Sequence, residues 1–160
     1  MKQRYVALLR AITNVSMKPF REKMENLGFT DVERYGMSGN LHFNTKRTDL
    51  ATLERLISKQ FGTPAMVRTS SQLTKVVAND PFGSSILFLT RSPTAAKRRT
   101  FLQLDFESPA PLIRGKTIYF VHPARLRGKR VSFDFESALG LLGTARSAQV
   151  VRRILALMTE

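Results

Sequence analysis

The chain has 160 residues, of which 42% are hydrophobic, so it can form one ordinary domain or two small packed subdomains with a real core. It contains no cysteine, which excludes disulfide bonds, thiolate catalysis and cysteine-ligated metals. Lys and Arg number 26 against 12 Asp and Glu, which gives a formal net charge of +14, and both halves of the chain carry the excess. A field of this sign attracts polyanions, although positive charge alone also serves solubility.

The start of the chain does not read as a signal peptide, because the apolar run at residues 6–9 is too short for one. No apolar stretch approaches the length that spans a bilayer. We therefore expect a soluble cytoplasmic protein without a membrane partner.

Apolar spacing and turn residues predict the order β-α-β-β-α-β in the first part of the chain. The predicted elements are a strand at residues 5–9, a helix at 17–27, a hairpin at 32–44, a helix at 50–61 and a strand at 65–68. This is the order of a split βαβ, or ferredoxin-like, fold, in which an antiparallel sheet has both helices on one face.

A short connecting helix with Leu73 follows, and then a second, weaker copy of the same order begins. The elements predicted there are a strand at residues 86–89, a helix at 93–102, a hairpin at 111–121 and helices at 133–139 and 147–158. The predicted fold class is therefore α+β, with two ferredoxin-like subdomains packed side by side. Their predicted boundaries are residues 1–80 and 81–160, the second with an extra C-terminal helix.

Five stretches of the chain form a common pattern: residues 4–12, 27–32, 67–69 and 143–146, and Tyr35 with Ser38-Gly39-Asn40 and Phe43. In these stretches the chain resembles the bacterial "domain of unknown function 1697" family. The resemblance implies two ferredoxin-like subdomains and brings no established activity. The chain departs from the family pattern at residues 11–16, where a shorter loop without glycine replaces a glycine-rich one that could have cradled phosphate.

Polar side chains lie at two predicted joints of the first sheet. Arg10 and Asn14 follow the first strand, and Tyr35, Ser38 and Asn40 lie at the hairpin turn. Because the first and third strands of this fold are antiparallel neighbours, we expect these residues to approach one another and to suit an anionic ligand. The alternative is local: Asn and Ser at turns commonly bond their own backbone.

A second basic group lies in the last third of the chain. Arg125, Arg127, Lys129 and Arg130 crowd one loop, and Arg146 precedes the last helix. An arginine-rich loop can follow a phosphate backbone, and these residues are the candidates for polyanion binding. The alternative is an ordinary solvated loop.

The two histidines, His42 and His122, stand apart from each other and from any carboxylate cluster, so the sequence predicts no metal site, no cofactor and no catalytic residue. His42 alternates with Leu41 and Phe43 and is expected on the opposite sheet face, at the surface. The leading interpretation is a non-catalytic protein that binds a polyanion such as nucleic acid. The alternative is an enzyme or binder of a phosphorylated or carboxylated metabolite.

Overall fold

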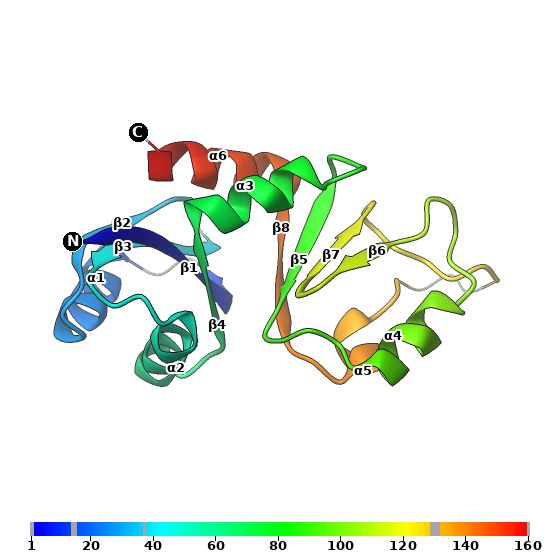
Figure 1. The fold of residues 1–160 in the computed structure, drawn as a ribbon, viewed down its shortest axis with the longest axis horizontal. Helices are drawn as coiled ribbons and strands as arrows, with labels where there is room; N and C mark the ends of the chain where they lie inside the picture. The colour runs from blue at the N-terminus through cyan, green and yellow to red at the C-terminus, as the bar shows by residue number, and fades with distance from the viewer. Residues whose placement is uncertain (1, 14–15, 37, 129–131, 160) are drawn as a thin grey trace. The chain divides into compact units, whose positions relative to one another are not determined.

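The computed structural model describes residues 2–13, 16–36, 38–128 and 132–159 (Figure 1). The elements of the first half are β1 (Gln3–Thr13), α1 (Met17–Asn26), β2 (Thr30–Arg34), β3 (Ser38–Thr45), α2 (Leu50–Phe61), β4 (Ala65–Thr69) and α3 (Ser70–Ala78). The elements of the second half are β5 (Ser85–Leu89), α4 (Ala95–Leu102), β6 (Leu112–Arg114), β7 (Thr117–Phe120), α5 (Phe135–Leu139), β8 (Gly143–Ser147) and α6 (Ala148–Thr159).

Each half contains a four-stranded sheet with the strand order of a ferredoxin-like fold. The first sheet runs β2-β3-β1-β4 and the second runs β6-β7-β5-β8, with antiparallel pairing throughout. The predicted fold class is therefore confirmed. The sequence missed β8, because this strand consists of small and polar residues and lacks the β-branched and aromatic pattern that predicts strands.

The chain divides into two compact units. The first unit contains residues 1–77 and 151–160, and the second unit contains residues 78–150. The sequence predicted a boundary after residue 80. The last helix was expected in the C-terminal subdomain, but its residues from 151 onward pack with the first unit. No helix in the described part of the chain is long and apolar enough to cross a membrane.

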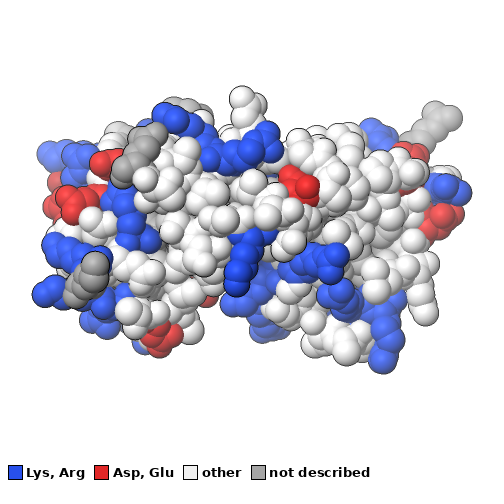
Figure 2. Space-filling view, turned by 45° about the horizontal axis from the view of Figure 1, so that its top comes forward, with Lys and Arg blue, Asp and Glu red and all other residues white. Residues whose placement is uncertain are grey.

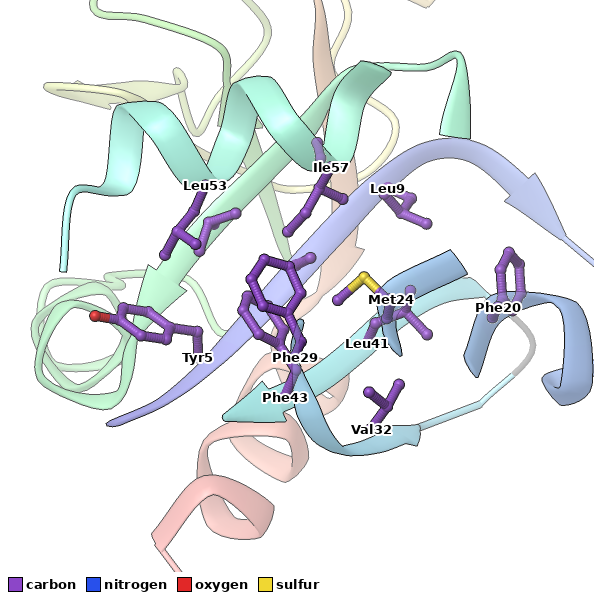
Figure 3. Close-up of a cluster of buried hydrophobic side chains, with 13 residues drawn as sticks. Tyr5, Leu9, Phe20, Met24, Phe29, Val32, Leu41, Phe43, Leu53 and Ile57 are labelled. Atoms are coloured by element: carbon purple, nitrogen blue, oxygen red, sulfur yellow. The ribbon is translucent and has the colours of Figure 1, made fainter. Parts of the chain in front are cut away.

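The core of the first unit lies between its sheet and the helices α1 and α2 (Figure 3). Tyr5, Ala7 and Leu9 alternate along β1 and enter this core. The rings of Phe29 and Phe43 stack at its centre, with their centroids 4.6 Å apart. The other buried members are Phe20, Met24, Val32, Leu41, Leu53, Ile57, Ala65 and Val67.

The core of the second unit is rich in phenylalanine. Phe101, Phe106, Phe133 and Phe135 contact one another, and Phe120 of β7 joins them. The ring centroids of Phe106 and Phe133 are 4.8 Å apart, in an edge-to-face arrangement that aromatic pairs favour. This cluster holds α4 and α5 against one face of the second sheet.

The other face of the first sheet is buried as well. Val6, Leu8 and Met66 lie on it and are almost completely shielded from solvent. His42 is 1% exposed on the same face, and its Nε2 lies 3.3 Å from the carbonyl oxygen of Ile154 in α6. The predicted face of His42 is therefore confirmed, but the expectation of a surface position was wrong, since α6 packs over this face.

A carboxylate from α2 bonds to the edge strand β4. Glu54 of α2 accepts the backbone N–H of Val67 at 2.9 Å and the guanidinium of Arg68 at 3.2 Å. Arg68 is 6% exposed and also donates to the carbonyl oxygen of Val67. One carboxylate thus pairs a buried cation and occupies an N–H of an edge strand, a group that could otherwise pair with another chain.

We expect His42 to make stability fall below pH 6.5. Burial is the main cause that lowers the pKa of His42 from its usual 6.5, and Arg4 lowers it further against the opposing effects of Ile154 and Glu33. As the pH falls below 6.5, the unfolded chain takes up a proton that the native imidazole does not, which costs at most about 1.4 kcal/mol per pH unit. Urea denaturation between about pH 5.5 and 7.5 should show this loss in the wild type and a smaller one in His42→Gln, which can still donate to Ile154. Equal slopes in the two proteins would contradict the assignment.

Candidate functional site

The register of β1 against β3 brings the two predicted joints together. Leu8 lies opposite Asn40, and Leu9 lies opposite Gly39, so the end of β1 is beside the start of β3 as the sequence predicts. The two strands approach so closely here that a Cβ added to Gly39 would lie 2.6 Å from the Cβ of Leu9. Glycine is therefore required at residue 39.

β1 leaves this register after Leu9. The next paired residue is Thr13, which lies opposite Ser38, so residues 10–12 form a bulge. Ala11 has a φ of 60°, in the left-handed region that costs a residue with a side chain about 1–2 kcal/mol. The glycine-free loop thus holds one residue in a conformation for which glycine would be the usual choice.

The backbone of Arg10 is held on the β4 side of β1. Its N–H donates to the carbonyl oxygen of Pro64 at 3.0 Å, and its carbonyl oxygen accepts the hydroxyl of Thr63 at 2.8 Å. Both of these contacts lie on the opposite side of β1 from Ser38. Asn14, the other candidate on this strand exit, lies outside the described residues.

Asn40 closes the turn between β2 and β3. Its side-chain Nδ2 donates to the backbone carbonyl oxygen of Tyr35 at 3.1 Å, and its backbone carbonyl oxygen accepts the backbone N–H of Tyr35 at 3.1 Å. Asn40 is 1% exposed, whereas Tyr35 and Ser38 are half-buried. The local alternative raised by the sequence, a turn amide that bonds nearby backbone, therefore describes the Asn40 side chain.

A pocket of about 370 Å³ lies at the opposite end of the same sheet. It is formed by the residue before β1, the start of β2, the end of α1 and the segment that leaves β3. Its polar lining consists of Lys2, Thr30, Asn44, Thr45, Lys46 and Arg47. This group was not predicted from the sequence, although the antiparallel pairing of β1 with β3 also places the start of β1 beside the end of β3.

The predicted polyanion loop packs beside an acidic segment. Arg127 pairs with Asp105 at 3.8 Å, with both side chains well exposed, and its N–H donates to the carbonyl oxygen of Asp105. The carbonyl oxygen of Arg125 accepts the N–H of Glu107 at 2.7 Å. Exposed pairs of this kind contribute about 0–1 kcal/mol, so Arg127 can exchange Asp105 for another anion at little cost. Lys129 and Arg130 lie outside the described residues.

Arg146 is 8% exposed in β8. Its Nη1 donates to the hydroxyl of Thr144 and, at 2.9 Å, to the carbonyl oxygen of Ala145. Burial lowers the pKa of Arg146 to about 10, which still leaves it charged at neutral pH. Arg146 and Arg68 occupy equivalent places in the two sheets. Arg146 lies opposite Ile86 of β5, and Arg68 lies opposite Val6 of β1.

In residues 2–13, 16–36, 38–128 and 132–159, no group of three or more His, Asp or Glu side chains is placed to hold a metal ion.

The two sheets and their helices define an α+β protein built from two ferredoxin-like units. The chain belongs to the family described as protein of unknown function (DUF1697), which matches residues 1–119. A conserved bacterial protein, SP0830, from Streptococcus pneumoniae has a similar solved structure, with a TM-score of 0.68 and 17% identity over 100% of both chains. This likeness shows the fold. No curated protein matches the chain.

We expect Asn40→Ala to lower the free energy of unfolding by about 0.5–1.5 kcal/mol, because the half-buried carbonyl oxygen of Tyr35 loses its amide donor. Asn79→Ala, at an exposed position, is the matched control and should change stability by no more than about 0.5 kcal/mol. Urea denaturation measures both. An Asn40→Ala protein as stable as the control would show that this amide does not hold the turn.

Proposed function

We propose that this protein is a non-catalytic binding protein for a polyanion, with nucleic acid as its partner. The observation that carries the proposal is the net charge of +14 on a folded body. With 26 basic and 12 acidic side chains, many cations have no carboxylate of the chain left to neutralise them. A body of this charge concentrates polyanions around itself and speeds their encounter.

Most of this charge lies where a partner can reach it. Figure 2 shows Lys and Arg side chains over one face of the molecule, with fewer Asp and Glu among them. Of the Lys and Arg residues in the described part of the chain, Arg68 and Arg146 are buried. We therefore leave Arg146 out of the proposed contact surface, although the sequence made it a candidate.

The second unit carries the candidate contact residues. Its exposed cations are Arg91, Lys97, Arg99, Arg114, Lys116 and Arg127. Lys97 and Arg99 are exposed on α4, a regular helix held in place by the buried Phe101. Cations fixed on such a scaffold can contact phosphates without a large ordering cost, and phosphate contacts bind nucleic acid without regard to sequence.

We expect the protein to bind mixed nucleic acid at low salt with an affinity that falls steeply as salt rises. Each phosphate contact on duplex DNA should add about 0.9 to the slope of log affinity against log salt. The double variant Lys97→Ala/Arg99→Ala should therefore lower the slope by up to about 1.8 if both cations contact phosphate. Fluorescence anisotropy with a labelled oligonucleotide measures this slope.

Gln103→Ala is the matched control, because it alters an exposed side chain at the end of the same helix without a change of charge. It should bind with the wild-type slope. Absence of binding at low ionic strength would reject the proposal, and a double variant with the wild-type slope would reject α4 as part of the interface.

A further inference from the structure

We propose that the basic pocket at the start of β1 binds a terminal phosphate group, as carried by a small phosphorylated compound or by the end of a nucleic acid. The pocket consists of Lys2, Thr30, Asn44, Thr45, Lys46 and Arg47, with Leu27 and Gly28 at the end of α1. The inference stands apart from the polyanion proposal, because it concerns a bounded pocket in the first unit and not the general surface charge.

The fold itself gathers these residues. Gln3 of β1 lies opposite Thr45 of β3, and Thr30 of β2 lies opposite Asn44. The residue that precedes β1 and those that follow β3 therefore lie at the same end of the sheet. Lys2 enters from one segment and Lys46 from another, so the positive charge converges from separate parts of the chain.

The backbone at Arg47 is held on both sides. Its N–H donates to the hydroxyl of Thr45 at 3.2 Å, and its carbonyl oxygen lies 2.9 Å from the hydroxyl of Tyr5. Tyr5 is buried and its ring stacks on Phe43, so this anchor belongs to the hydrophobic core. The guanidinium of Arg47 thus extends from a fixed point, which reduces the entropy lost when it binds a ligand.

Asn44 is oriented by two contacts. Its Oδ1 accepts from Arg4 at 3.1 Å, and its Nδ2 donates to the carboxylate of Asp31 at 2.8 Å. The second N–H of the same amide is then available on a fixed group. Thr30 accepts a hydrogen bond from Lys2 at 3.1 Å, so its hydroxyl keeps its own hydrogen to donate.

The charge of the lining selects the ligand. Three cations face the pocket and its lining residues include no carboxylate. Of the adjacent carboxylates, Glu33 lies 3.5 Å from Arg4, and Asp31 accepts a hydrogen bond from Asn44. A phosphate monoester carries a charge between about −1.5 and −2 at neutral pH and presents three acceptor oxygens, which matches this set of donors better than a single carboxylate does.

The volume leaves room for more than the phosphate. About 370 Å³ lies at the lower end of the range of about 300–1,000 Å³ typical of small-molecule sites. Leu27 adds an apolar contact at the end of α1. A compound the size of a sugar phosphate is therefore a suitable probe.

The test is isothermal titration calorimetry of the full chain with glucose 6-phosphate, with glucose as the unphosphorylated control. We expect saturable binding of the phosphorylated probe and none of glucose. Lys46→Ala should weaken binding about tenfold or more, since it removes a charge-assisted contact. Lys59→Ala removes the same charge from an exposed position on α2 outside the pocket and should bind as the wild type does.

A second arm identifies the source of the phosphate and uses a short oligonucleotide with and without a 5′ phosphate. Tighter binding of the phosphorylated form, lost in Lys46→Ala, with no binding of glucose 6-phosphate, would support the site and assign it to nucleic-acid ends. Equal affinities of Lys46→Ala and Lys59→Ala for every probe, or no difference between phosphorylated and unphosphorylated probes, would overturn the inference. These comparisons concern the phosphate group alone. A failure of the phosphate-site inference can therefore be distinguished from a failure of general polyanion binding.

Discussion

The antiparallel pairing of β1 with β3 is the constraint on which the first unit depends. It runs from Gln3 opposite Thr45 to Leu9 opposite Gly39, and a slip of one residue would exchange every buried side chain between the two faces of the sheet. The same pairing fixes both polar groups of this unit, one at each end. At the bulged end the side chain of Asn40 is used to close a turn, whereas at the other end three cations line an open pocket.

Two arginines are buried within the strands of the two sheets. The buried cations Arg68 and Arg146 occupy equivalent strand positions, and each donates to the carbonyl oxygen of the preceding residue. Arg68 has Glu54 as its counterion, whereas Arg146 donates to the hydroxyl of Thr144. The other Lys and Arg side chains in the described part of the chain are half-buried or exposed.

Most of the fold could be predicted from the sequence, because it depends on local signals. Apolar alternation, helical spacing and the Ser38-Gly39-Asn40 turn specify the first ferredoxin-like order and its β1–β3 neighbours. The burial of His42 could not be predicted, because it depends on α6, more than a hundred residues further along the chain. The pocket could not be predicted for a similar reason. Lys2 and Arg47 belong to no shared sequence motif, and the register between β1 and β3 brings them together. Arg146 looked accessible because β8 itself lacks the usual strand pattern.

The contact between Ile154 of α6 and His42 of β3 has a consequence for biosynthesis. The ribosome delivers the chain from its N-terminus, and domains generally fold as they emerge. Here the strands of the first sheet are complete long before α6 has been translated, so the contact of His42 with Ile154 forms only after the whole second unit has been made. The face of the first sheet that bears His42 therefore lacks this helix until translation is nearly finished.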